Sequence, residues 1–459
     1  MKPSPKDLTN HHAFPFKPGA RVLFANFPAD GHFNPLTGLA VHLKRLGYDV
    51  RWYTSATYAD KLKKLSIPHY PFKTALDIGG KNPEEVFPQR AHYKSQVSKL
   101  KFDIIHLFVL RAPEYYADIR AIHKSFPFDV MVADVAFTAI PLVKEHLKIP
   151  VVSIGVVPLA ETSRDLPPMG LGLTPARSFM GKLKQSFLRF FADQVIFKQP
   201  YQVLKTVLGR YGVAPEGNVF DTLIRKSTLL LQSGTPGFEY HRSDLSPNIR
   251  YIGPLLPHQK LKAEKWFDDR LLTYEKVILV TQGTVENDVD KLIVPTLEAY
   301  QNTDRLVVVT TGGAGTEALR KRFPAPNIII EDFIPFADVM PYAHVYVTNG
   351  GYGGVLLSIQ NKVPLVVGGI HEGKIEINAR VGYFGLGVNM KTEKPTPEQV
   401  KKSVEKVLHD KVYKSHVTRL SEEFNRYHPE EIFTRYIEEI LVSRPEKALP
   451  AVAQRAQLA

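Results

Sequence analysis

Short apolar runs alternate with segments of helical spacing along most of the chain. The first run, RVLFANF at 21–27, leads into the polar loop PADGHFNP, and leucines and alanines then recur at helical spacing between Pro35 and Gly47. Pro is favoured at the first helical position and Gly just past a helix end. A second apolar run follows at 50–54. The pattern predicts a strand, a helix and a second strand, the unit from which helix-covered parallel sheets are built.

The same alternation continues in both halves of the chain. Proline and charge replace it near residue 260, which indicates a linker. We therefore predict an α/β fold of two Rossmann-like, doubly wound domains facing a cleft. Further strand-like runs lie at 129–133, 151–156, 277–281, 306–310, 327–331, 344–348 and 363–367. The predicted parts are an N-terminal domain (1–252), a linker (253–268), a C-terminal domain ending in helices (269–441) and a flexible tail (442–459).

One segment departs from the alternation. Between Leu166 and Tyr211, a stretch with Pro and Gly is followed by the basic, aromatic run KLKQSFLRFFADQVIFK. Its helical pattern is typical of an aromatic helix that packs onto the domain or over a pocket, and also of a helix that lies on a membrane surface. We expect the first arrangement and keep the second as the alternative.

The composition is that of a globular protein with more than one domain. The 459 residues are 44% hydrophobic and carry a formal net charge of +13, with the basic residues scattered along the chain. The absence of cysteine excludes disulfides and cysteine nucleophiles. The N-terminal residues lack the apolar run of a signal peptide, and no stretch approaches the roughly 20 apolar residues of a membrane span. We expect a cytoplasmic protein without stable membrane insertion.

A histidine and an aspartate follow two of the predicted strands in the first half. His32 lies in the loop after the first strand, and Asp134 directly follows the run DVMVA. Strand ends of a parallel sheet meet at one edge, where open α/β sheets bind ligands. A carboxylate beside an imidazole fixes its tautomer, so the pair could deprotonate a hydroxyl. A structural or solvated histidine and an aspartate that caps a helix are the alternatives.

Glycine-rich and polar turns follow the strands predicted for the second half. A turn between a strand and a helix lets the backbone approach a ligand, and the free N–H groups of the helix attract a phosphate. Neither the P-loop nor the G-x-G-x-x-G pattern is present. Phe333, after the third of these strands, could stack on a base. The turn residues are Gly283, Thr284, Thr311, Gly312, Gly350, Gly351, Gly353 and Gly354.

The sequence gives no reason to expect a metal or a cofactor. Asp288 and Asp290 form a DxD pair, but acidic residues are also favoured in the first turn of a helix, which is predicted there. No His and Glu cluster has the spacing of metal ligands, and the Gly-x-Ser-x-Gly pattern of serine hydrolases is absent.

Taken together, these motifs resemble those of the nucleotide-sugar-dependent glycosyltransferases of the GT-B fold, over about residues 20 to 440. The GHxxP loop of that family corresponds to Gly31–Pro35 and implies that His32 is the general base, which Asp134 orients. The donor region of the family is similar to residues 333–378. The resemblance implies that Phe333 stacks on the nucleobase, that the turn at 349–354 binds the diphosphate, and that Asn378 completes the site.

Three departures from the family pattern bear on the donor. Asn349 replaces a histidine at the start of the diphosphate loop, and Leu357 replaces a glutamate that grips the ribose hydroxyls. An apolar side chain leaves a 2′-hydroxyl unpaired, which favours deoxythymidine. Lys374-Ile375 replaces an Asp-Gln pair that holds glucose, which favours a less hydroxylated sugar such as rhamnose. His371 and Glu372 are expected to bind the remaining hydroxyls.

We therefore expect an inverting glycosyltransferase that moves rhamnose from dTDP-rhamnose to a small aromatic acceptor such as a flavonoid. A UDP-glucose-dependent glucosyltransferase, a UDP-sugar epimerase and a basic protein that binds nucleic acid or a membrane surface are the alternatives. The expected partners are the nucleotide sugar and the acceptor, and not nucleic acid. Aromatic residues expected to wall the acceptor site are Phe33, Phe108, Phe137, Phe187 and Phe191.

Overall fold

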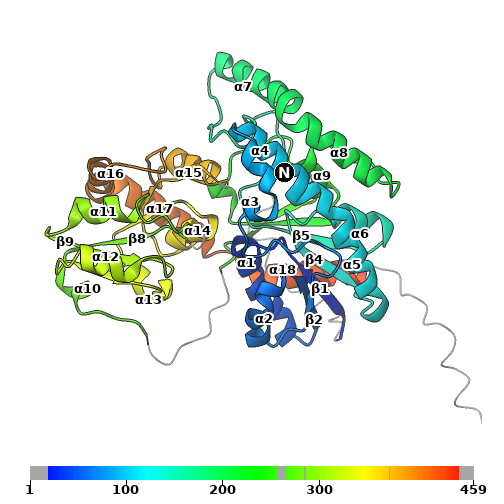
Figure 1. The fold of residues 1–459 in the computed structure, drawn as a ribbon, viewed down its shortest axis with the longest axis horizontal. Helices are drawn as coiled ribbons and strands as arrows, with labels where there is room; N and C mark the ends of the chain where they lie inside the picture. The colour runs from blue at the N-terminus through cyan, green and yellow to red at the C-terminus, as the bar shows by residue number, and fades with distance from the viewer. Residues whose placement is uncertain (1–18, 257–264, 284–285, 372, 444–459) are drawn as a thin grey trace, which may run out of the picture.

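The computed structural model describes residues 19–256, 265–283, 286–371 and 373–443. It contains two parallel sheets with helices on their faces, one in each half of the chain (Figure 1). The predicted class, two parallel-sheet α/β domains, is confirmed. None of the helices in these ranges is both long and apolar enough to cross a membrane.

The N-terminal sheet has seven parallel strands in the order β3-β2-β1-β4-β5-β6-β7. β1 and β4, the central strands, are buried almost throughout, as expected for strands covered on both faces. The strands are β1 (Arg21–Ala25), β2 (Asp49–Thr54), β3 (His69–Pro71), β4 (Val130–Asp134), β5 (Val151–Gly155), β6 (Leu229–Ser233) and β7 (Ile249–Gly253).

The C-terminal sheet has six parallel strands in the order β10-β9-β8-β11-β12-β13. It repeats the plan of the first sheet, because chain order runs outward on one side of β8 and then resumes on the other side with β11. Its strands are β8 (Lys276–Thr281), β9 (Arg305–Thr310), β10 (Ile328–Glu331), β11 (Val345–Thr348), β12 (Leu365–Val367) and β13 (Gly387–Asn389).

Helices connect the strands in both halves. Those of the N-terminal half are α1 (Asp30–Arg45), α2 (Ala59–Leu65), α3 (Pro83–Val86), α4 (Gln96–Asp103), α5 (Ala112–Ser125), α6 (Ile140–His146), α7 (Phe179–Ala192), α8 (Lys198–Gly209) and α9 (Val219–Arg225). Those that follow are α10 (Arg270–Thr273), α11 (Ile293–Tyr300), α12 (Thr316–Arg322), α13 (Phe336–Val339), α14 (Tyr352–Gln360), α15 (Lys374–Tyr383), α16 (Pro397–His409), α17 (Lys411–Phe424) and α18 (Pro429–Val442).

The first helix begins earlier than predicted. α1 starts at Asp30, so Pro35 lies inside the helix and not at its first position. The acidic Asp30 suits the first turn, where the helix dipole favours negative charge. As a result His32 lies in the first turn of α1, directly after the β1 loop, and not in the loop itself.

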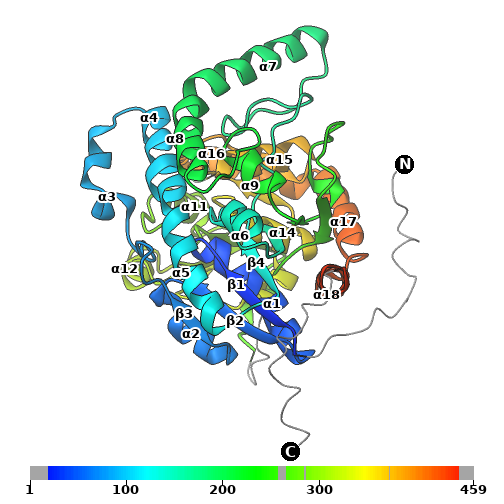
Figure 2. The same ribbon diagram turned by 90° about the vertical axis from the view of Figure 1, so that its right-hand side faces the viewer.

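The last helix returns to the N-terminal domain. Phe433, Ile437 and Leu441 of α18 are buried in the same hydrophobic cluster as Val22 and Phe24 of β1. Figures 1 and 2 show α18 beside the N-terminal half of the molecule. The last helix of the predicted C-terminal domain (269–441) therefore packs against the N-terminal domain. Of the predicted linker and tail, 257–264 and 444–459 lie outside the described residues.

A buried ion-pair network joins the two domains. Arg380 of α15 binds Glu239, whose Oε1 lies 2.6 Å from Nη2 of the arginine, and both side chains are almost fully buried. Arg242 contacts the same glutamate at 3.3 Å. Glu376, one turn before Arg380, accepts hydrogen bonds from the backbone N–H groups of Gly170 and Gly172. The C-terminal domain is thus tied to the segment that precedes α7.

Candidate active site at the two sheet edges

In each sheet the chain order of the strands reverses direction at one position, and the predicted site residues lie at the carboxyl ends of the strands there. In the first sheet β1 lies between β2 and β4, and in the second β8 lies between β9 and β11. Loops that leave neighbouring strands in opposite directions leave a crevice at the carboxyl ends, where open α/β sheets bind ligands. His32 and Asp134 follow β1 and β4, and Gly283 and Asn349 follow β8 and β11.

The predicted catalytic pair is in direct contact. Nδ1 of His32 lies 2.7 Å from Oδ1 of Asp134. Asp134 is fully buried, and its carboxylate also accepts hydrogen bonds from the backbone N–H groups of Phe27, at 2.6 Å, and Ala136, at 2.8 Å. Hydrogen bonds from backbone N–H groups stabilise the charged form of a carboxylate. The geometry is that of an aspartate held in one orientation against an imidazole.

The contact also decides which imidazole nitrogen can react. An ionised carboxylate only accepts hydrogen bonds, so Nδ1 of His32 carries the proton that it shares with Asp134. Nε2 is then the nitrogen with a free lone pair. The His32 side chain keeps 19% of its surface exposed, so this lone pair is within reach of a ligand. The arrangement can accept a proton at Nε2 and stabilise the resulting imidazolium.

Two aromatic rings stand beside the histidine. The Phe27 ring meets His32 edge-on at 5.5 Å between centroids and stacks on Phe108 at 4.7 Å. Phe108, predicted as an acceptor wall, is half-buried and thus keeps an exposed surface near the base. Phe27 was not predicted, because it reads as the last residue of an apolar strand.

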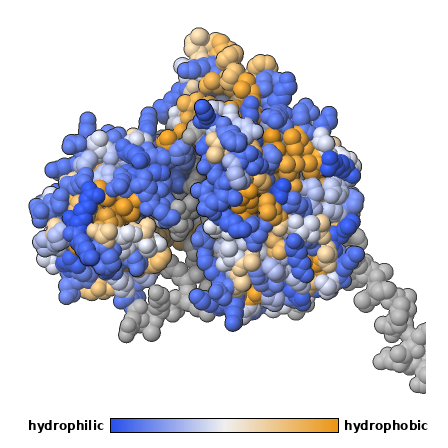
Figure 3. All heavy atoms as spheres, viewed as in Figure 1, coloured by the Kyte–Doolittle hydropathy of each residue, from blue (hydrophilic) through white to orange (hydrophobic). Residues whose placement is uncertain are grey.

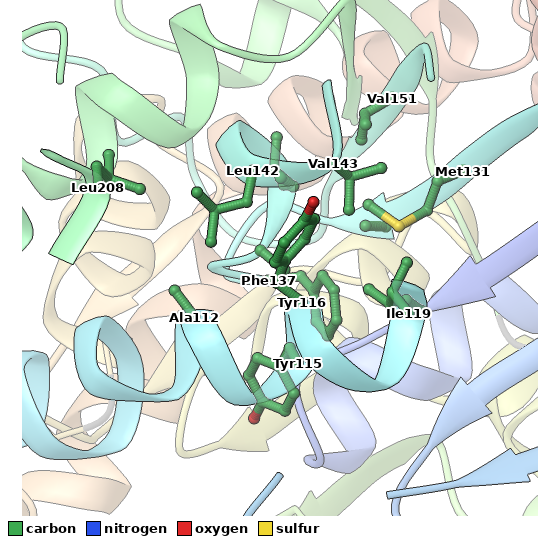
Figure 4. Packing of buried hydrophobic residues seen from close by; sticks show 14 of the residues in the cluster. Ala112, Tyr115, Tyr116, Ile119, Met131, Phe137, Leu142, Val143, Val151 and Leu208 are labelled. Atoms are coloured by element: carbon green, nitrogen blue, oxygen red, sulfur yellow. The ribbon is translucent and has the colours of Figure 1, made fainter. Parts of the chain in front are cut away.

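The other predicted acceptor residues lie elsewhere. Phe33 is 1% exposed and stacks on Tyr58, and Phe137 is fully buried against Tyr115. Figure 4 shows Phe137 among the packed side chains of the N-terminal core. Because both rings are enclosed by core residues, neither presents a wall to a ligand, which corrects the expectation for them. The remaining two, Phe187 and Phe191, are exposed on α7.

Three turns of the C-terminal sheet meet at its edge. A side chain added at Gly283 would lie 3.5 Å from the Asn349 amide, and one added at Gly312 would lie 3.6 Å from the Gly283 carbonyl. Both glycines have positive φ angles, +81° and +70°, which favour glycine. Nδ2 of Asn349 donates to the carbonyl oxygen of Gln282 and so joins the turns after β8 and β11.

Asn378 holds the next pair of loops. Its Nδ2 donates to the carbonyl oxygens of Gly369, at 2.9 Å, and Asn349, at 3.3 Å, and the residue is 1% exposed. Gly350, with φ of +89°, passes so close to the Asn378 amide that any side chain at position 350 would overlap it. The predicted glycine at 350 is thus required by both backbone conformation and space.

The start of α14 is open to a ligand. Nothing lies within 4 Å of a side chain added at Gly351 or Gly353, and Gly354 faces the Tyr346 ring. Leu357 lies one turn after Gly353 on the same face of α14 and is partly buried against the C-terminal core. Phe333 is 72% exposed in the loop after β10, so its ring is free to stack on a planar ligand.

The residues predicted to hold the sugar differ from one another in their contacts. Nε2 of His371 lies 3.1 Å from Oε2 of Glu393, which gives this half-exposed imidazole a carboxylate partner that was not predicted. Lys374 begins α15, next to Ile375, which packs on Gly172 of the N-terminal domain.

Thr311, one of the predicted turn residues, is buried. Its hydroxyl group forms a hydrogen bond with the hydroxyl group of Thr316 at 2.6 Å, so Thr311 shapes the turn. Thr284 and Glu372 lie outside the described residues.

A surface crevice beneath α7 lies between the domains. Its lining includes Leu166, Met169 and Phe197 of the N-terminal half and Glu376 and Arg380 of α15. None of the predicted acceptor residues lines it. Sequence reasoning missed the ion-pair network to which its lining residue Arg380 belongs, because Glu239 and Arg380 are far apart in sequence and neither belongs to a recognisable motif.

Known proteins are similar to this chain over most of its length. Residues 295–439 match the family model described as Erythromycin biosynthesis protein CIII-like, C-terminal domain. The chain is 34% identical over 410 residues to 4'-demethylrebeccamycin synthase of Lentzea aerocolonigenes, covering 88% of this chain and 96% of the relative. It is 28% identical over 420 residues to UDP-glycosyltransferase 2 of Phaeomoniella chlamydospora, covering 88% and 92%.

Solved structures share the fold. The calicheamicin glycosyltransferase CalG4 superposes with a TM-score of 0.70 at 22% identity, covering 93% of this chain and 99% of the other. The spinosyn rhamnosyltransferase SpnG complexed with thymidine diphosphate gives 0.64 at 14% identity, covering 91% and 100%. With two parallel-sheet domains, site residues at both switch points and this relationship along its length, the chain belongs to the GT-B nucleotide-sugar-dependent glycosyltransferases, enzymes that transfer a sugar from a nucleotide sugar to natural-product acceptors.

Proposed function

We propose that this glycosyltransferase is an inverting enzyme that moves rhamnose from dTDP-rhamnose to a hydroxyl of a small aromatic acceptor such as a flavonoid. The observation that carries the inverting mechanism is the 2.7 Å contact between His32 and the buried Asp134. It supplies a single base with a fixed tautomer. A direct displacement needs only this base, whereas the covalent retaining mechanism of glycosidases needs a second carboxylate as the nucleophile.

The proposed step moves one proton and one sugar. Nε2 of His32 takes the proton of the acceptor hydroxyl as its oxygen forms a bond to the anomeric carbon. The bond from that carbon to the diphosphate breaks, and its electron pair leaves with the diphosphate oxygen. Attack opposite the leaving group inverts the anomeric centre. Asp134 stabilises the imidazolium until the proton is lost to solvent.

Backbone groups are proposed to stabilise the departing diphosphate. The open N-terminus of α14 offers free N–H groups at Gly351 and Gly353, and the helix dipole favours negative charge there. Asn349 contributes by joining two turns, because Nδ2 already donates to the Gln282 carbonyl. We propose that no metal or cofactor takes part. Turnover that persists in a metal chelator would support this, and loss of turnover reversed by a divalent cation would contradict it.

Leu357 is the basis of the donor assignment. It follows Gly353 by one helical turn, so a nucleotide diphosphate bound at the start of α14 would present its sugar ring near this apolar side chain. A ribose 2′-hydroxyl there would lose its hydrogen bonds to water without replacement, whereas deoxyribose would not. The SpnG neighbour bound to thymidine diphosphate supports such a donor. Ile375, which packs on Gly172, has an apolar side chain and offers no hydrogen-bond partner to a sugar hydroxyl. This supports rhamnose, which has fewer hydroxyl groups than glucose.

A UDP-glucose-dependent reaction is the second candidate. Several relatives that match most of the chain carry the name UDP-glucosyltransferase, among them UDP-glucosyltransferase 1 of Beauveria bassiana. In that case a different group would have to bind the ribose hydroxyls. Calorimetric titration with dTDP and UDP separates the two candidates directly, because both ligands share the diphosphate site.

Leu357→Glu sharpens this test. A carboxylate can accept hydrogen bonds from both ribose hydroxyls, so we expect the ratio of UDP to dTDP affinity to rise by about tenfold, the value of one hydrogen bond to a charged group. Leu357→Gln is the matched control, with the same length and no charge. If the wild type prefers UDP, or if the ratio does not change in Leu357→Glu, the deoxythymidine assignment is wrong while the His32 mechanism stands.

The acceptor class rests on the aromatic surface beside the base. Phe27 and Phe108 form a stacked pair that reaches His32, and such a surface suits a planar phenol. Turnover of flavonols with dTDP-rhamnose is the expected result. Turnover of sterols or lipids without any phenol would overturn this choice of acceptor.

A further inference from the structure

The apolar side chains of α7 face away from the protein. Six large hydrophobic residues of this helix are exposed, from Phe191 at 50% to Phe179 at 80%. A surface helix of a globular domain normally turns its apolar stripe toward the core. Figure 1 shows α7 at the upper edge of the molecule, and Figure 3 shows hydrophobic surface gathered there. The six are Phe179, Met180, Leu183, Phe187, Phe190 and Phe191.

The helix is attached through its polar side. Gln185 is buried, donating from Nε2 to the Thr174 carbonyl at 2.8 Å and accepting from the Ala176 N–H at 3.2 Å. Arg189 donates to the Leu166 carbonyl. These contacts hold the side opposite the exposed rings against the preceding loop, so the outward apolar face is fixed by hydrogen bonds. The expectation that the aromatic run packs onto the domain is therefore confirmed only for its end, where Ala192 and Phe197 are buried in the N-terminal core. It is wrong for the six exposed side chains of α7.

Basic side chains flank the apolar face. At 100° per residue, Phe179, Leu183, Phe187 and Phe190 form one stripe, Lys184 lies on one side of it and Lys182 on the other. Both lysines are exposed, and α7 contains no Asp or Glu. An apolar arc bordered by lysines is the arrangement of helices that lie in a lipid interface.

We propose that α7 docks this enzyme on an anionic lipid surface, with its aromatic stripe among the acyl chains and Lys182 and Lys184 at the headgroups. Charge decides between this occupant and a second copy of the chain. Two α7 helices face to face would bring lysine against lysine, whereas anionic headgroups offset these charges. The inference does not depend on the donor or the acceptor, because neither lysine belongs to the proposed active site.

Vesicle sedimentation of the full chain tests the proposal. We expect the protein to pellet with vesicles that contain phosphatidylglycerol and to remain in the supernatant with phosphatidylcholine alone. Phe179→Gln with Phe190→Gln should weaken binding by about tenfold or more, because two buried rings are lost. Lys182→Glu with Lys184→Glu should weaken it by a similar factor. Gln has good helix propensity, so α7 should remain folded, which circular dichroism checks.

The control removes exposed apolar residues elsewhere. Leu272→Gln with Val412→Gln changes two exposed side chains on α10 and α17 and should leave vesicle binding unchanged. Phe187 and Phe191 stay in place in every variant, which keeps the test apart from the acceptor prediction. The proposal is overturned by absence of binding, by equal binding of Phe179→Gln with Phe190→Gln, by binding to DNA in place of vesicles, or by self-association that these substitutions abolish.

Discussion

The two sheet edges of this molecule share a topology and differ in chemistry. At the first, His32 follows β1 and contacts Asp134 at the end of β4, with Asp134 buried and His32 partly exposed. At the second, the turns after β8 and β11 are built from glycine and an asparagine. A base must change its charge during the reaction, whereas a diphosphate site must accept a charge that is already present. The same fold position can therefore supply a titrating side chain or a fixed set of N–H groups.

Among the substitutions that test this difference, removing the charge of Asp134 should have the largest effect. Asp134→Asn keeps the shape but replaces one accepting oxygen with an NH2 group and removes the negative charge that stabilises the imidazolium. We therefore expect kcat to fall by about 10²- to 10⁴-fold. Donor affinity, measured by calorimetry, should be retained. Asp118→Asn is the matched control, since Asp118 is also buried in the same domain, where it binds Tyr53 and not a histidine. Similar kcat losses in both variants would contradict the account.

Breaking the ion pair between the two domains should have the second largest effect. Arg380→Met leaves the buried Glu239 without its closest cation, and we expect a loss of about 3 kcal/mol in the free energy of unfolding, measured with urea. Arg322→Met, which removes an exposed pair with Glu298, should cost less than about 1 kcal/mol. Equal losses would show that the buried contact between the domains stabilises the protein no more than an exposed ion pair does.

The same network should respond to acid. Burial alone would raise the pKa of Glu239, but Arg380 and Arg242 outweigh it and hold the pKa below its ordinary value of 4.5. Because the folded-state pKa is lowered, its contribution to stability is complete above 4.5 and is lost as pH falls through the folded pKa. The melting temperature of Glu239→Gln should therefore fall less steeply below this pH than that of the wild type.

A change at Gly350 should have the smallest of these effects and act on the donor edge alone. Gly350→Ala strains a backbone with φ of +89° and displaces the Asn378 amide, so we expect donor affinity to fall by about tenfold or more. Gly212→Ala imposes similar strain, at φ of +68°, in open space on the N-terminal domain. If both variants lose donor affinity equally, local strain and not the shape of the donor site is responsible.

Much of the fold could be predicted because buried parallel strands leave a clear signal. VILVT and HVYVT are continuous apolar runs that lead into glycine turns, and they are found as β8 and β11. β3 and β13, of three residues each, are too short to differ from loops in sequence. The return of α18 to the N-terminal domain was missed because its amphipathic pattern does not specify which core it covers.

The site was predictable where chemistry and strand ends coincide. His32 and Asp134 were paired because both follow neighbouring strands, and the structure places them in contact. Phe33 and Phe137 were misjudged because an aromatic residue near a strand end suits a core as well as a pocket. The exposed face of α7 was only the second of two expectations for the same reason, since amphipathic spacing does not say which side meets solvent.

The central claim is that the N-terminal edge holds the base and the C-terminal edge holds the donor. Calorimetric titration and steady-state turnover of His32→Ala, performed on one preparation, test it most directly. We predict that the affinity for the nucleoside diphosphate stays within about twofold of the wild type while kcat falls by about a hundredfold or more. Near-complete activity with intact donor binding would contradict the assignment of His32 as the base.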